Sequence, residues 1–186
     1  MEQNEDKMDM ETEPTEQAEQ TFHVDPVKMQ AFNDRLEAEQ NLLLGVLGGV
    51  VAAAIGAAIW AVVTVVTKYQ IGWMAIGVGF LAGYAVRMLG KGVSKTFGIV
   101  GAMCALFGCL LGNVLSACGF LANQESIPIL RLVINVLTQP ALAVELLKIT
   151  FSPMDLLFYG IAVYEGYKFS FRQITQEEIA SLNKDQ

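Results

Sequence analysis

Three long apolar runs, at residues 41–67, 71–89 and 97–121, constrain this chain more than any other feature. Each run is long enough to cross a bilayer, which takes about 20 consecutive apolar residues. All 17 glycines follow residue 44, and 15 of them lie between Gly45 and Gly119. Glycine weakens a helix in water, but in a membrane it lets two helices approach closely. The sequence therefore predicts an all-α integral membrane protein that crosses the bilayer several times.

The net charge of −7 is concentrated at one end of the chain. Residues 1–40 contain twelve acidic and three basic residues, a net charge of −9, so the remainder carries +2. We expect residues 1–24 to form a disordered acidic tail, because they have few large apolar side chains to bury. This tail is either simply solvated or a docking segment for a basic partner. A nucleic-acid partner is not expected, since such surfaces need clustered basic residues.

The apolar runs and their boundaries predict a bundle of four membrane-spanning helices. The first three spans cover about residues 42–67, 71–89 and 96–121, and the short links between them make consecutive spans antiparallel. The fourth span covers about residues 153–171. Its start is marked by Ser152, which can cap a helix, and by Asp155, which completes a capping box. The acidic start and the length of the first run argue against a cleavable signal peptide.

Two further segments are predicted to lie at the membrane surface. Residues 25–40 place Met29, Phe32 and Leu36 on one side of a short amphipathic helix. Residues 126–150 are apolar with a narrow polar stripe, and Pro140 interrupts their middle. We interpret this amphipathic segment as two short helices lying on or dipping into the membrane, with a fifth span as the alternative. Residues 173–186 form a polar C-terminal tail.

Small residues recur at steps of four in each of the first three spans, a spacing typical of closely packed membrane helices. They are Gly45 and Gly49, then Gly79 and Gly83, then Cys104, Gly108, Gly112 and Ser116. The spacing leaves open whether the partner helix belongs to the same chain or to a second copy. The fourth span is aromatic and is expected to carry Glu165 instead of a glycine ladder.

Basic residues predict the orientation in the membrane. Lys91 and Lys95 lie in the loop between the second and third spans, and Lys168 and Arg172 lie at the end of the fourth. Cytoplasmic loops carry an excess of lysine and arginine. Both termini are therefore expected in the cytoplasm.

Few residues in the spans suggest a specific polar role. Arg87 and Glu165 fall at similar depths in two spans that run in the same direction, so we consider an interhelical ion pair between them. The alternative is that Arg87 extends to lipid headgroups and Glu165 meets Lys168. Asn113 in the third span is expected to form an interhelical hydrogen bond rather than to bind a substrate.

The residue types associated with catalysis and metal binding are missing or scattered. The three cysteines lie in one apolar helix but do not share a face, which favours packing over metal ligation. The sequence has no zinc spacing, nucleophile elbow or phosphate-binding loop. We therefore expect no enzymatic activity, no metal and no cofactor.

Two stretches are similar to a known group of proteins. They are GWMAIGVGFLAGYAVR at residues 72–87, and FSPMDLLFYG at residues 151–160 with YEGY at 164–167. Both resemble an uncharacterised family of bacterial multi-pass membrane proteins with about four spans, over about residues 41–172. The resemblance implies the bacterial inner membrane. It supplies no catalytic or binding residues.

The leading functional expectation is a non-enzymatic membrane scaffold or accessory subunit, acting by helix packing. Its partners would be the lipid bilayer and either a second copy or another membrane protein. The alternative is a small-solute or ion transporter or channel that works as an oligomer.

Overall fold

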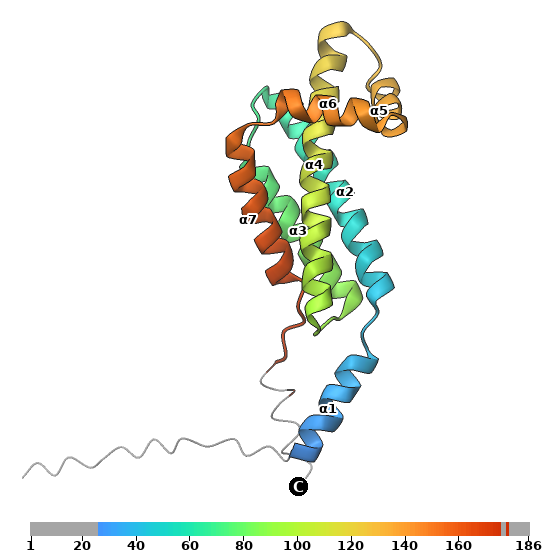
Figure 1. Ribbon diagram of the computed structural model, residues 1–186, viewed down its shortest axis with the longest axis vertical. Helices are drawn as coiled ribbons and strands as arrows, with labels where there is room; N and C mark the ends of the chain where they lie inside the picture. Colours follow the sequence, from blue (N-terminus) through green and yellow to red (C-terminus); the bar gives the residue numbers. More distant parts are fainter. Residues whose placement is uncertain (1–25, 176–177, 179–186) are drawn as a thin grey trace, which may run out of the picture.

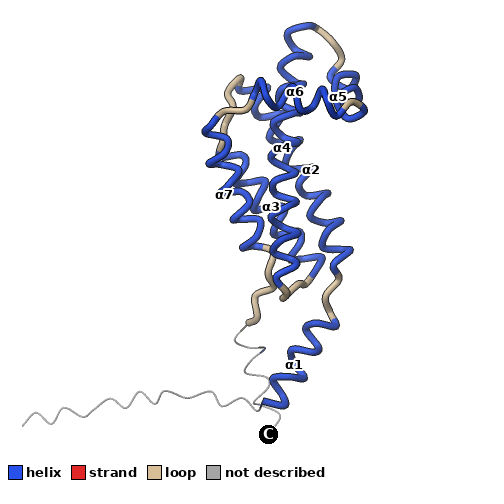
Figure 2. The backbone as a smooth tube through the Cα atoms, viewed as in Figure 1, coloured by secondary structure: helices blue, strands red, loops and turns tan. Residues whose placement is uncertain are grey.

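The computed structural model describes residues 26–175 and residue 178. This part of the chain consists of helices and loops without a strand, which confirms the predicted all-α class (Figure 2). The helices are α1 (Pro26–Ala38), α2 (Leu42–Thr67), α3 (Trp73–Gly90), α4 (Lys95–Glu125), α5 (Ile129–Thr138), α6 (Pro140–Thr150) and α7 (Pro153–Phe169). The predicted acidic tail and most of the predicted C-terminal tail lie outside the described residues.

Four helices form an elongated bundle. Helix α2 packs against α3 and α4, and α7 packs against the other side of the same two helices. Helix α1 projects from one end of this bundle, while α5 and α6 lie near the other end (Figure 1). The pairs α2–α3 and α3–α4 are antiparallel, as their short links require.

Three of the described helices, α2, α3 and α4, are long and apolar enough to cross a membrane. A fourth crossing would be added if the bent pair α5–α6 formed one span. The outward face of α2 is lined by exposed aliphatic side chains such as Leu43, Val51 and Ile59. By composition, then, the chain is compatible with a multi-pass membrane protein.

The helix boundaries follow local chemistry. The side chain of Asn41 accepts a hydrogen bond from the N–H of Leu44 at 3.0 Å, which caps the start of α2. Helices α2, α3 and α4 each end at a residue with positive φ, namely Lys68, Lys91 and Ser126. Helix α4 continues four residues beyond the predicted end at residue 121, because its polar extension is solvent-exposed and compatible with a helix. Helix α7 ends at Phe169, two residues before its predicted end.

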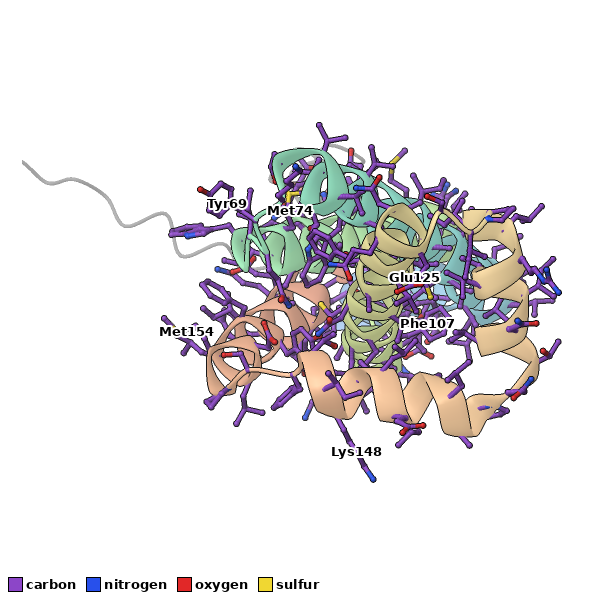
Figure 3. The ribbon with its side chains drawn as sticks, turned by 90° about the horizontal axis from the view of Figure 1, so that it is seen from above. Tyr69, Met74, Phe107, Glu125, Lys148 and Met154 are labelled. Atoms are coloured by element: carbon purple, nitrogen blue, oxygen red, sulfur yellow. The ribbon has the colours of Figure 1, made fainter. Side chains whose placement is uncertain are left out.

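Helices α5 and α6 meet at a bend of 111°, with Pro140 at the start of α6. Viewed from above, the two helices form an L beside α4, and Lys148 points away from the bundle (Figure 3). Val136 of α5 is buried in a cluster with Val114 and Cys118 of α4. The polar stripe is exposed; it consists of Arg131, Asn135, Thr138 and Glu145.

Helix α1 differs from the expected surface helix in its direction. Its predicted apolar face is the less exposed one, since Leu36 is buried and Met29 and Phe32 are half-buried. However, the helix extends away from the end of the bundle (Figure 1). Just after its C-terminal end, Glu39 pairs with Arg172 and the Asn41 N–H donates to the carbonyl of Gly90, which joins the helix to the bundle.

Candidate functional site

The candidate site is the set of close contacts through which α7 joins the bundle. Its buried face contains polar residues near the start, small residues in the middle and a serine just past the end: Asp155, Tyr159, Ala162, Gly166 and Ser170. These residues recur every three or four positions, so they share one side of the helix. That side lies against α3 and α4.

The polar part of this face is a hydrogen-bonded chain that links three helices. Asn113 of α4 donates from Nδ2 to the hydroxyl oxygen of Tyr159 at 3.0 Å. The Tyr159 hydroxyl donates to the backbone carbonyl of Cys109 at 3.4 Å, and the Cys109 thiol donates to the carbonyl of Ala75 at 3.8 Å. Asn113 thus forms an interhelical hydrogen bond, and its partner Tyr159 was not singled out from the sequence.

The start of α7 is fixed by a capping box. The backbone N–H of Ser152 donates to the Asp155 carboxylate at 2.8 Å, and the Ser152 hydroxyl accepts from the N–H of Met154 at 3.4 Å. Asp155 is only 5% exposed. Its carboxylate is therefore already engaged in holding the helix end.

We predict that Ser152→Ala destabilises the protein by about 1 kcal/mol, because a backbone donor loses its cap. Ser94 at the start of α4 is a matched control, since its side chain makes no capping hydrogen bond. Ser94→Ala should leave the unfolding midpoint in detergent nearly unchanged. Equal losses for the two variants would contradict the role assigned to Ser152.

The small residues of α7 permit backbone contact with both neighbours. A methyl group at Gly79 of α3 would lie 2.8 Å from the Cα of Ala162, and one at Gly83 would lie 2.7 Å from the carbonyl oxygen of Gly166. A methyl group at Gly166 would lie 2.7 Å from the carbonyl oxygen of Gly101 in α4. The three helices therefore touch backbone to backbone along this line.

The last span, which was expected to carry Glu165 instead of a glycine ladder, has a ladder of small residues of mixed type. Ala162, Gly166 and Ser170 stand at steps of four, which is the signal that identified the ladders of the first three spans. Most aromatic residues of α7 lie on its other faces, whereas Tyr159 shares the buried face with these small residues. Applying the same spacing rule to this helix finds its packing face from the sequence alone.

The ladders of the first three spans also meet helices of the same chain. A methyl group at Gly49 of α2 would lie 2.8 Å from the Cys104 sulfur of α4, and one at Gly45 would lie 3.2 Å from the Cα of Gly90. A methyl group at Gly112 would lie 2.7 Å from the Trp60 ring. The remaining members face inward as well: Gly108 meets Ala53, and the buried Ser116 hydroxyl donates to the carbonyl of Gly112.

Two buried groups of α2 are not accounted for by these contacts. Trp60 Nε1 and Thr64 Oγ1 have no hydrogen-bond partner among the described residues, although both side chains are at most 1% exposed. They lie one turn apart on the face of α2 that packs near Gly112.

Arg87 and Glu165 are both half-buried, but their side chains form no ion pair in the part of the chain that the structure describes. Helices α3 and α7 run parallel, in a register set by the contacts described above. That register places Arg87 level with Ser170, about 7.5 Å along the axis from Glu165.

The neighbours of Glu165 on α7 make contacts of their own. Phe169 lies one turn beyond Glu165, packs near Gly83, and contacts the ring of Phe80 with centroids 4.8 Å apart. The proposed alternative partner of Glu165 is also engaged elsewhere. The ammonium group of Lys168 lies over the rings of Tyr164 and Phe169, at 5.7 and 6.0 Å from their centroids.

A second polar cluster ties the end of the bundle to α1. The Arg172 guanidinium pairs with Glu39 at 3.0 Å and with Glu178 at 2.8 Å, while its backbone N–H donates to the carbonyl of Gly92. The hydrogen bond from Arg172 holds the pKa of Glu39 below its ordinary value of 4.5. Arg172 thereby connects α1, the α3–α4 loop and the C-terminal segment.

We predict that acid or salt loosens α1 from the bundle. The lowered pKa means that the Glu39 contact is fully present above about pH 4.5 and is lost as pH falls through the folded-state value. Salt weakens the same exposed pair by screening. Spin labels on α1 and the α3–α4 loop should move apart at low pH, whereas Glu39→Gln should already be loose at pH 7. If the unsubstituted protein and Glu39→Gln gave the same distance distribution at low pH and at pH 7, the Glu39–Arg172 pair would not hold α1 to the bundle.

No group of three His, Cys, Asp or Glu residues that could hold a metal occurs among the described residues. The buried hydroxyl, amide, thiol and carboxylate groups of α4 and α7 instead serve contacts between helices. A shallow apolar cavity of about 340 Å³ lies outside this interface, between Leu110 of α4 and Val144 of α6.

Comparison of the chain with protein-family models, curated proteins and solved structures gave no match.

Proposed function

We propose that this chain is a non-enzymatic membrane protein that acts as a scaffold or accessory subunit through its helix surfaces. The main support for this proposal is that the interior of the helix bundle is closely packed. Methyl groups at Gly79, Gly83 or Gly166 would already collide with neighbouring backbone. A bundle packed this tightly has its available surface on the outside, where another protein or lipid can bind.

The proposal assigns the four crossings to α2, α3, α4 and α7. Helix α7 has 17 residues, a length of about 26 Å, and lies alongside α3 and α4 (Figure 1). The bent α5–α6 pair is short and carries its polar residues on an exposed stripe. These features support a position at the membrane interface rather than a further crossing.

The proposed orientation places both termini in the cytoplasm of the cell. Lys91 and Lys95 lie at the end of the bundle where α7 finishes, shortly after Lys168. Arg172 follows α7, and its backbone N–H donates to the carbonyl of Gly92 in the same loop. This clustering of basic residues supports a cytoplasmic location for that end. The resemblance to bacterial multi-pass proteins makes the inner membrane of a bacterium the proposed compartment.

A solute or ion transporter is the weaker candidate. A transporter needs a polar path or a site that can open between helices. Here Asn113 and Tyr159, the buried polar side chains between α4 and α7, bond to each other. We expect a tagged protein purified in mild detergent to retain a stoichiometric protein partner. Liposomes containing the purified protein should show no solute flux. Flux that is abolished by Glu165→Gln would instead establish transport and overturn the scaffold proposal.

A further inference from the structure

The outer side of the α3–α7 contact is an aromatic surface with one positive and one negative charge. We call it the α3–α7 seam and define it by Trp73, Phe80, Tyr84, Arg87, Phe158, Glu165 and Phe169. The α3 members lie at helical positions i, i+7, i+11 and i+14, and the α7 members at i, i+7 and i+11, so each set forms one stripe. Ring contacts join the stripes: Trp73 meets Phe158 at 6.3 Å and Phe80 meets Phe169 at 4.8 Å between centroids.

The charges of the seam are not satisfied within the described chain. Arg87 and Glu165 are half-buried and form no ion pair among the described residues. Counted along α7, Glu165 lies about 18 Å from Pro153 and about 6 Å from the end of the helix at Phe169, within the proposed span. Ionised groups at such depth are costly in lipid unless they are paired or neutralised. A partner that contacts the seam from the lipid side would relieve this cost for both groups.

We infer that the α3–α7 seam binds the same seam of a second copy, with Arg87 of each chain pairing with Glu165 of the other. A two-fold axis along the membrane normal keeps every residue at its own depth. The two charges then meet across the interface with the same axial offset, about 7.5 Å, which the long arginine side chain can span. The seam carries one positive and one negative charge, so its charges are complementary to those of a second seam turned by 180°. This favours a symmetric dimer over an unrelated partner.

The aromatic residues of the seam fit this contact. Trp73 is 72% exposed and Phe80 is 45% exposed, and both lie on the same stripe of α3 as Arg87. Large aromatic side chains supply much of the energy of protein interfaces. The inference rests on the proposed scaffold function and specifies its partner as a second copy of this chain.

Charge reversal in two differently tagged, co-expressed copies tests the inference in the membrane. Retention of the second copy by the first should fall at least about tenfold when both copies carry Arg87→Glu, because like charges then face each other. The same loss is expected when both copies carry Glu165→Arg. Combining an Arg87→Glu copy with a Glu165→Arg copy should restore retention, since both cross-pairs are then attractive. Glu145→Arg on the exposed side of α6 is the control and should have no effect.

Co-expression of one Arg87→Glu copy with one Glu165→Arg copy distinguishes pairing between two chains from pairing within one chain. If the two residues paired within one chain, retention would be restored when one copy carries both Arg87→Glu and Glu165→Arg. It would not be restored by mixing the two single variants, and that combination of results would overturn the inference. If wild-type copies failed to associate and a different protein were retained instead, the partner would not be a second copy of this chain. The proposed scaffold function would still hold in that case. Solute flux through the monomer would overturn the scaffold function itself. Folding of each single variant is checked by its recovery in the mixed pair.

Discussion

Replacing Gly79 by alanine should destabilise the bundle by about 1–3 kcal/mol, the usual range for overpacking a tight interior. The added methyl group would meet the carbonyl oxygen of Ala162 and would lie 2.8 Å from its Cα. Both atoms are backbone, so relief requires that α3 and α7 move apart. That movement would also weaken the contact between Gly83 and Gly166 one turn away. Unfolding in mixed micelles, followed by the loss of helix signal, measures the effect.

Gly77 provides a control two residues away on the same helix. It has no atom within 4 Å of the position where a methyl group would be added. Gly77→Ala should therefore be neutral or stabilising by up to about 1 kcal/mol, since alanine is the better helix former. If Gly79→Ala and Gly77→Ala had the same effect, the close contact of α3 with α7 would be wrong.

Truncating Tyr159 to alanine should cost about 3–5 kcal/mol, as for other large buried aromatic residues. The side chain is 5% exposed and packs in a cluster with Trp60, Val78 and Cys109. Its removal leaves a cavity where α3, α4 and α7 meet and removes the partner of Asn113. The midpoint of unfolding in detergent should fall by more than for any single polar substitution of α7.

Two companion substitutions separate packing from hydrogen bonding. Tyr159→Phe keeps the ring and should cost about 1–3 kcal/mol, because it leaves the buried Asn113 amide without its partner. Tyr164 lies on the same helix but is 58% exposed. Tyr164→Ala should change the unfolding midpoint little. A large loss at Tyr164 with none at Tyr159 would place the wrong face of α7 against the bundle.

Several elements of the fold could be predicted because a local signal marks their ends. The bounds of α2 coincide with the expected residues 42–67, since a polar residue stands on each side of an unbroken apolar run. The start of α7 follows from its capping box, and the change from α5 to α6 follows from Pro140. These signals involve residues a few positions apart, so they can be recognised without knowledge of the tertiary structure.

The pairing of helices could not be predicted in the same way. Small-residue spacing identified inward faces on α2, α3 and α4, but spacing does not state which helix lies opposite. An ion pair between Arg87 and Glu165 within one chain was one of two alternatives, and it was based on approximate depth. The actual register depends on the contact of Gly79 with Ala162, and it places Arg87 about 7.5 Å along the axis from Glu165. The hydrogen bond between Asn113 and Tyr159 depends on that same tertiary register.

The central claim is that α2, α3, α4 and α7 cross the membrane while α5 and α6 stay on the side opposite both termini. Cysteine labelling with a membrane-impermeant reagent tests it most directly, using single cysteines in a variant that lacks Cys104, Cys109 and Cys118. The account predicts that cysteines at Tyr69, Glu125 and Phe151 react from outside intact cells. Cysteines at Ser94 and Gln173 should react only after the membrane is permeabilised. Reaction of positions 125 and 151 from opposite sides would make α5–α6 a membrane crossing and contradict the account.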